Sequence, residues 1–473
     1  MKKVLLFDEF KSLSKNEFRE FGKFVHSPYI NNRSEVMRLY EAIKKFYPDF
    51  NAEKMDEEII YKKIYPGKKF NAVLMRKAYS LIMILFQKYI VDIRFKKNRL
   101  QYELELIESL RERKLLKLHH KKYRNYKKFL GESKETMEVY EYIYKSENEM
   151  RFHYEGMNSQ IENSSRSLSK IYSYFFTVIL NEHLNILCLI SDFHKTFEVQ
   201  LFDKILAYLD DSEYRKYPLI NFYYLMVKLK ITGEMTYFNE LIDFRSKYSG
   251  KLEEEHYYNA LVILLDYCLI NIGMGKSEFR ITMFELSRVF ADEYLMNKNS
   301  TEPITFTNIV RNCAVLKHFK WADEFISKYN GNLHPSERTS IVNYCQGMIE
   351  FEKGNYSKAL KILSRLNLKW ANMKNDIKKI VIKCYYELGY FEELMLQIDS
   401  YRHFVNSYVT SAAHTTRGNK NFIKYISRLK DCRNSNEIIA AEVLKTEVEY
   451  SEYFYHKEWI ILKLDAIINK KGR

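Results

Sequence analysis

The stretch that decides the fold is Tyr344-x-x-Gly347, followed by Gly354-Asn355-Tyr356-x-x-Ala359-Leu360-x-x-Leu363. Small residues such as Gly347 and Ala359 let two paired helices cross closely, and an aromatic residue at position 356 fills the gap beyond them. Gly354 is placed to end the first helix of the pair. This stretch therefore predicts a two-helix repeat unit.

The same residue pattern recurs at a fixed spacing on both sides of this stretch. Trp321, Tyr356 and Phe391 are 35 residues apart, and Gly354 and Gly389 share that spacing. We expect the three aromatic side chains to occupy equivalent buried sites, and further degenerate helix pairs to lie upstream. The unit at Trp321 lacks the glycines, so a non-repetitive helical bundle with a coincidental spacing is the alternative.

Shorter helices are predicted at the N-terminal end. Ser14-x-x-Glu17 is a capping box that opens a helix, and Ser27-Pro28 ends it because the residue before proline avoids helical geometry. Further helices are expected near 34–47, 56–64 and 74–90. We predict an N-terminal helical domain over 1–95, long and partly basic helices over 96–215, and helical repeats with a C-terminal capping helix over 216–473.

The composition supports an all-α fold. Only 14 Gly and 6 Pro occur in 473 residues, too few to punctuate many short strands. No apolar stretch has the length of a signal peptide or a membrane span. The six cysteines are scattered singly in apolar runs, which is typical of free buried thiols. We therefore expect a cytoplasmic protein.

Several stretches resemble a bacterial protein family. They are Leu13-Ser-Lys-Asn-Glu-Phe18 with Ser27-Pro-Tyr-Ile-Asn31, Tyr65-Pro-Gly67 with Phe70, Thr307-Asn-Ile-Val310, Trp321-Ala-Asp-Glu-Phe-Ile326, Tyr385-Tyr-Glu-Leu-Gly389 and Asn421-Phe-Ile423. The chain is similar there to bacterial tetratricopeptide-like helical proteins, and the resemblance is thin between about 100 and 210. It implies an N-terminal helical domain followed by a degenerate tetratricopeptide-like α-solenoid, and it implies no activity, cofactor or site residue.

Motifs for catalysis, cofactors or metals do not emerge. Gly273-Met-Gly275-Lys276-Ser277 ends like a phosphate-binding loop, but the required first glycine is replaced by Ile270. Glu253 to Glu255 precede His256 and fit the first turn of a helix better than an acid–base site. His119 and His120 are adjacent, so on a helix they point about 100° apart and do not chelate one ion. We expect no enzyme activity, no cofactor and no metal site.

Charge is distributed unevenly along the chain. Residues 1–130 hold 31 Lys and Arg against 16 Asp and Glu, a net charge of +15 that equals the net charge of the whole chain. On one helix over 111–128, the steps of four and seven residues place a basic stripe on one face, with Leu115, Leu116, Leu118 and Tyr126 facing the protein. The candidate anion- or partner-binding residues are Arg113, Lys114, Lys117, Lys121, Arg124 and Lys128. The stripe is either a site for an anionic partner, which would be a nucleic acid, an acidic protein surface or an anionic membrane face, or a solvated face in a lysine-rich protein.

These features favour a non-catalytic scaffold that binds a segment of a protein partner on the surface of helical repeats. The alternative is a nucleic-acid-binding protein that acts through the basic N-terminal region.

Overall fold

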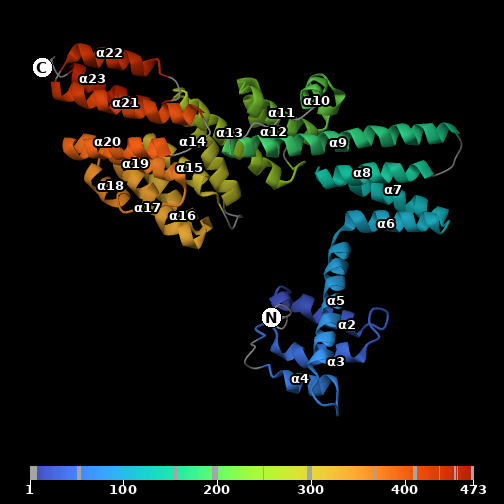
Figure 1. The fold of residues 1–473 in the computed structure, drawn as a ribbon. Helices are drawn as coiled ribbons and strands as arrows, with labels where there is room; N and C mark the ends of the chain where they lie inside the picture. The colour runs from blue at the N-terminus through green and yellow to red at the C-terminus, as the bar shows by residue number, and fades with distance from the viewer. Residues whose placement is uncertain are drawn as a thin grey trace. The chain divides into compact units, whose positions relative to one another are not determined.

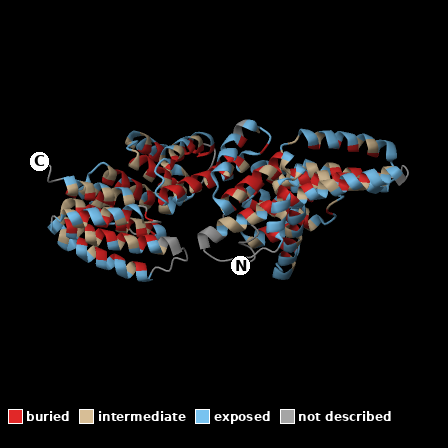
Figure 2. Ribbon diagram, turned by 90° about the horizontal axis from the view of Figure 1, so that it is seen from above, coloured by how far each residue is buried: buried red, intermediate tan, exposed pale blue. Residues whose placement is uncertain are grey.

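A computed structural model describes residues 8–50, 55–152, 157–193, 201–248, 250–295, 301–366, 368–407, 413–435, 437–451, 454 and 456–469. Within these ranges the protein is all-α, which confirms the predicted fold class (Figure 1). No strand is present in them, and the one β-type pairing there is an isolated bridge between Glu135 and Leu252. Many helices carry buried residues along one side and exposed residues along the other (Figure 2), whereas the helix over 218–232 is buried on nearly every side.

The chain forms two compact units, which are described separately. The first comprises residues 1–133 and 141–167, and the second comprises 134–140 and 168–473. The predicted division at residues 95 and 215 stays a prediction. The helices of the first unit are α2 (Lys15–His26), α3 (Ser34–Ile43), α4 (Glu57–Ile64), α5 (Ala72–Lys97), α6 (Arg99–Glu112) and α7 (Leu116–Glu132), and α8 (Met137–Glu149) and α9 (Met157–Phe193) contribute to both units.

Local signals set the helix ends of the first unit as the sequence predicts. The side chain of Ser14 accepts a hydrogen bond from the amide of Glu17, and the carboxylate of Glu17 accepts one from the amide of Ser14. This capping box opens α2, which ends at His26, two residues before Pro28. Asp56 caps α4 in the same manner, with its carboxylate accepting from two backbone amides. The predicted starts and stops of these two helices are confirmed.

Aromatic side chains fill the core of the first unit. The ring of Phe10 lies against those of Phe18, Phe21 and Phe86 at centroid distances of 5.4 to 5.9 Å. The hydroxyl of Tyr40 donates to the backbone oxygen of Phe18 at 3.0 Å, so a polar group on a buried ring is satisfied across two helices.

The second unit is a succession of helices in which neighbours along the chain pack against each other. They are α10 (Phe202–Asp210), α11 (Pro218–Thr232), α12 (Met235–Lys247), α13 (Glu254–Gly273), α14 (Phe279–Phe290), α15 (Pro303–Val315), α16 (Phe319–Tyr329), α17 (Pro335–Glu352), α18 (Tyr356–Leu363), α19 (Ala371–Leu388), α20 (Phe391–Ser407), α21 (Ala413–Ser435), α22 (Ile438–Glu449) and α23 (Lys457–Ile468). Helix α15 also contacts α17, and α17 contacts α19, so alternate helices lie side by side.

One type of turn recurs between paired helices. After α17, Gly354 has φ +83°, its amide donates to Phe351 O, and the amide of Asn355 donates to Glu350 O. These two bonds and the left-handed residue define a Schellman motif, a turn that commonly ends helices. The same pair of bonds recurs in four further places in the described chain, at left-handed Lys114, Gly275, Lys317 and Gly389.

This turn corrects the predicted repeat register. Helices α16, α18 and α20 begin two residues after the left-handed residue, at Phe319, Tyr356 and Phe391. Phe319 therefore takes the place that the 35-residue spacing assigned to Trp321, because the interval from Phe319 to Tyr356 is 37 residues. Trp321 lies half-buried within α16.

The equivalent buried positions are not the predicted aromatic ones. Tyr356 and Phe391 are half-buried at the starts of their helices. Five residues after each left-handed residue lies a fully buried side chain, namely Ala322, Ala359 or Leu394. Gly347 lies opposite Leu363, where an added Cβ would overlap the leucine. The small residues thus set the close helix crossing, as the sequence predicts.

The six cysteines are free thiols, five of them buried and Cys188 half-buried. No helix in the described ranges combines the length and the apolar character that crossing a membrane requires.

Candidate functional site

The structure separates the six basic residues that the sequence grouped together. Arg113 and Lys114 lie in the turn between α6 and α7, where Lys114 has φ +57°. A single helix over 111–128 is therefore wrong, because the turn breaks it after Glu112. The remaining four residues stay on α7, and they are Lys117, Lys121, Arg124 and Lys128.

These four residues form an exposed stripe along α7, and the opposite face of the helix is buried through His119, Tyr123, Tyr126 and Leu130. Lys128 lies 3.7 Å from the carboxylate of Glu132. Within the described ranges, no carboxylate lies within ion-pair distance of Lys117, Lys121 or Arg124.

The leucines next to the stripe do not face the protein, which contradicts the prediction. Leu115, Leu116 and Leu118 are 48%, 50% and 45% exposed. The turn after α6 places them at one end of the α6–α7 hairpin.

The inner side of α7 contains acidic partners for other basic residues. The ammonium of Lys127 lies 2.7 Å from the nearly buried carboxylate of Glu147. Arg111 pairs with the buried carboxylate of Glu149, and its guanidinium lies 5.0 Å from the centre of the Phe152 ring. This pair borders a pocket of about 310 Å³. Its lining contains the carboxylates of Glu105, Glu108 and Glu149 against the cations of Arg111 and Lys145, so the pocket does not favour an anionic ligand.

A second polar cluster lies among α15, α17 and α19, and sequence reasoning did not identify it. Arg311 on α15 donates to the hydroxyl of Tyr344 on α17 at 2.6 Å and pairs with the carboxylate of Asp376 on α19. The side chains of Arg311 and Asp376 are 34% and 29% exposed, so solvent reaches this part of the cluster. The carboxylate of Asp376 helps to hold the pKa of Arg311 above its ordinary value although burial opposes this.

Two lysines of α19 extend this cluster. Lys379 and Lys383 are each only 6% exposed. No carboxylate in the described ranges lies within ion-pair distance of either ammonium group. The ammonium of Lys383 instead lies 4.4 Å from the ring centre of Phe351 and 5.5 Å from that of Trp459. Burial lowers the pKa of Lys379 to about 8 and also lowers the pKa of Lys383.

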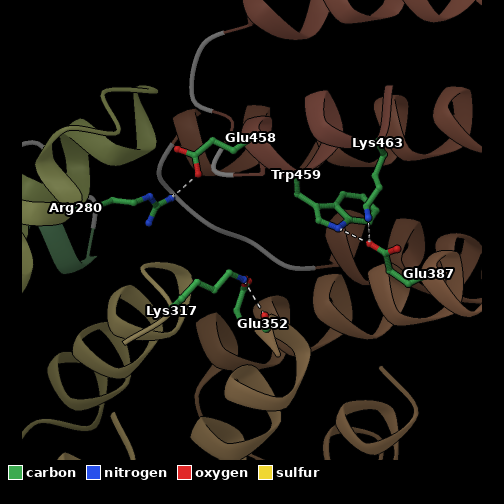
Figure 3. Close-up of polar contacts among 7 residues, drawn as sticks. All are labelled: Arg280, Lys317, Glu352, Glu387, Glu458, Trp459 and Lys463. Carbon is green, nitrogen blue, oxygen red and sulfur yellow. Dashed lines mark hydrogen bonds and ion pairs between the residues drawn. The ribbon is translucent and has the colours of Figure 1, made fainter. Parts of the chain in front are cut away.

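Residues of α23 form polar contacts with α19 and α14 (Figure 3). The indole nitrogen of Trp459 donates to the carboxylate of Glu387 at 2.9 Å, and Lys463 lies 2.7 Å from the same carboxylate. Glu458 pairs with Arg280 of α14 at 3.4 Å. Helix α23 is thereby joined both to α19 and to a helix 178 residues earlier in the chain.

The side chains described for this region, together with the Lys317–Glu352 pair at 3.1 Å (Figure 3), carry an excess of positive charge. Six are cationic and four are carboxylates, which leaves a surplus of two. Burial, followed by the charges of Lys383 and Lys379, lowers the pKa of His456 well below its ordinary value, so His456 is neutral at pH 7 and adds no charge. The cations are Arg280, Lys317, Arg311, Lys379, Lys383 and Lys463, and the carboxylates are Glu352, Asp376, Glu387 and Glu458.

One sequence signal could have pointed to these lysines. Lys379 and Lys383 stand four residues apart, on the same helix face as the buried residues Ile380 and Cys384 of an otherwise apolar run. Basic residues at such core positions are rare unless they are paired or functional. The segment 273–277, which resembles the end of a phosphate-binding loop, lies at the end of α13 and contains Lys276, whose ammonium donates to the side chain of Asn271 at 2.9 Å.

Within the described ranges, no group of three or more His, Cys, Asp or Glu side chains is arranged to hold a metal ion. No family model, no curated protein and no solved structure matches this chain.

Proposed function

We propose that this chain is a non-catalytic scaffold that binds an acidic segment of a partner protein against helices α15, α17 and α19. The observation that carries the proposal is the pair of nearly buried lysines, Lys379 and Lys383, which form no ion pair with a carboxylate of the described residues. A buried ammonium group is costly unless an anion compensates it. A Glu or Asp side chain of the partner would supply the missing negative charge.

The repeated helix pairs support the proposal. We infer that α13 to α20 form a degenerate tetratricopeptide-like α-solenoid, because the same turn ends α13, α15, α17 and α19. Arrays of this kind present alternate helices side by side as an extended surface for a bound segment. The free thiols are typical of a reducing compartment, so we place the interaction in the cytoplasm.

The test measures binding of fluorescent peptides that contain two to four Glu residues, by anisotropy. The double variant Lys379→Met/Lys383→Met removes the unpaired charges. The matched control Lys361→Met/Lys420→Met makes the same charge change at exposed positions. Charged hydrogen bonds contribute about 1.5–3 kcal/mol each, so the first variant should lose about 100-fold or more in affinity.

The three outcomes have different meanings. Loss of binding in the buried-lysine variant alone supports the proposal. Equal loss in both variants points to diffuse electrostatic attraction and contradicts a site at α19. Absence of binding by the wild-type chain to every acidic peptide rules out an acidic segment as the ligand.

A further inference from the structure

We propose that the tip of the α6–α7 hairpin, residues 113–121, is a docking surface for an anionic lipid bilayer. Three leucines within four residues are about half exposed there, at 48%, 50% and 45% for Leu115, Leu116 and Leu118. The turn at Lys114 reverses the chain between the two helices and brings these leucines to one end of the hairpin. Nothing else in the described part of the first unit exposes three large apolar side chains so close together in the chain.

Apart from the exposed Glu112 at the end of α6, the charged residues next to these leucines in the chain are basic. From Arg113 to Gly131 the sequence contains no Asp or Glu. Arg113, Lys114, Lys117 and Lys121 are all exposed, and in the described ranges none of the four is within ion-pair distance of a carboxylate. The guanidinium of Arg113 donates to the backbone oxygen of Ser109, one turn back on α6.

This combination fits the interface of a bilayer. Exposed leucines enter the boundary between headgroups and acyl chains, while lysine and arginine extend their charged ends to the lipid phosphates. Each basic residue near an anionic surface contributes about 1 kcal/mol, which is about a fivefold gain in affinity. The N-terminal end of α7 therefore has both components that reversible membrane binding requires.

The leucines favour a bilayer over a nucleic acid. Binding to a phosphate backbone depends on basic groups, and stacking with bases depends on aromatic side chains. The three leucines provide neither interaction, and they lie on the same tip as the basic residues. A nucleic acid would leave the apolar part of this tip in water.

Two exposed leucines of the second unit, which lie outside the basic tip, serve as controls. Leu396 is 70% exposed and lies on α20, three and four residues from Glu393 and Glu392. Leu462 is 61% exposed and lies on α23 between Glu458 and Asp465. Replacing these leucines removes exposed apolar surface without touching the basic tip.

The experiment measures co-sedimentation of the full chain with vesicles of phosphatidylcholine containing about 30% phosphatidylserine, and with vesicles of phosphatidylcholine alone. We expect binding to the anionic vesicles only. The variant Leu115→Ser/Leu116→Ser/Leu118→Ser should bind about 100-fold more weakly, because each half-exposed leucine contributes about fivefold. The variant Lys114→Gln/Lys117→Gln/Lys121→Gln should lose a similar factor, and Leu396→Ser/Leu462→Ser should bind as the wild type does.

A gel shift with a 30-nucleotide RNA and a 30-base-pair DNA completes the test. If the leucine variant keeps full vesicle binding, or if the wild type binds no anionic vesicle, the proposal is overturned. It is also overturned if the wild type binds nucleic acid but not vesicles and only the lysine variant loses that binding, since the tip is then a phosphate-backbone surface. The mutated positions are exposed, so an unchanged near-ultraviolet circular dichroism spectrum confirms that each variant is folded.

Discussion

Replacing Lys379 by methionine should stabilise the ligand-free protein. Burial lowers the pKa of Lys379 from 10.5 to about 8. One pKa unit corresponds to about 1.36 kcal/mol, so the charged ammonium costs the folded state about 3 kcal/mol at pH 7. The residue is only 6% exposed, so solvent screens little of this cost. Methionine has a similar length and packs well in irregular apolar surroundings.

The pH dependence of this gain in stability distinguishes the removal of a buried charge from a steric improvement. Because the folded pKa lies below the unfolded one, the cost is fully present below about pH 8 and disappears above about pH 10.5. The gain in the free energy of unfolding from Lys379→Met should therefore be about 3 kcal/mol at pH 7 and about 1.5 kcal/mol at pH 9.5. A purely steric improvement would give the same gain at both pH values.

Urea denaturation followed by tryptophan fluorescence provides the measurement. The three tryptophans, Trp321, Trp370 and Trp459, all belong to the second unit, which contains Lys379. The control Lys361→Met changes an exposed lysine and should alter stability by less than about 0.5 kcal/mol. Destabilisation by Lys379→Met at pH 7 would refute the reasoning, because it would mean that the ammonium group has a stabilising partner in the folded protein.

Three further predictions concern the helix pairs and the turn at 273–277. Gly347→Ala should destabilise the protein by about 1–3 kcal/mol in thermal or urea unfolding, because the added Cβ overlaps Leu363; an unchanged stability would show that the two helices can move apart without cost. Tyr356→Ala should lower the free energy of unfolding by about 1–3 kcal/mol, because this side chain is only half-buried and a fully buried aromatic residue would cost about 3–5 kcal/mol. A larger loss of stability would show that the ring is a principal core residue. Neither the wild type nor Lys276→Ala should bind ATP in calorimetry, because Lys276 already donates to Asn271 and the turn lacks the phosphate-binding glycine; nucleotide binding that the substitution abolishes would contradict this.

The proposed scaffold function and the proposed bilayer surface rest on separate residues and separate units. Lys379 and Lys383 belong to the second unit, whereas residues 113–121 belong to the first. Acidic-peptide binding should therefore survive the leucine substitutions at the hairpin tip. Vesicle binding should equally survive Lys379→Met/Lys383→Met, and the two binding assays provide controls for each other.

The sequence by itself determined the features that a few neighbouring residues encode. The capping box at Ser14 and Glu17, the helix end before Pro28 and the left-handed turns at Gly354 and Gly389 depend on contacts within about six residues, so local chemistry is sufficient to predict them. The all-α class follows for the same reason, because a chain so poor in glycine and proline offers few places to punctuate strands.

Only the tertiary structure decided which faces are covered. Lys114 and Lys317 adopt the left-handed turn without being glycine, so nothing in the sequence marked the break after α6 or the shifted register at Phe319. The burial of Lys379 and Lys383 depends partly on residues such as Trp459 that lie about 80 positions away. The exposure of the hairpin-tip leucines likewise depends on where other helices end. Side-chain period fixes which residues share a face, but long-range packing determines whether that face meets protein or solvent.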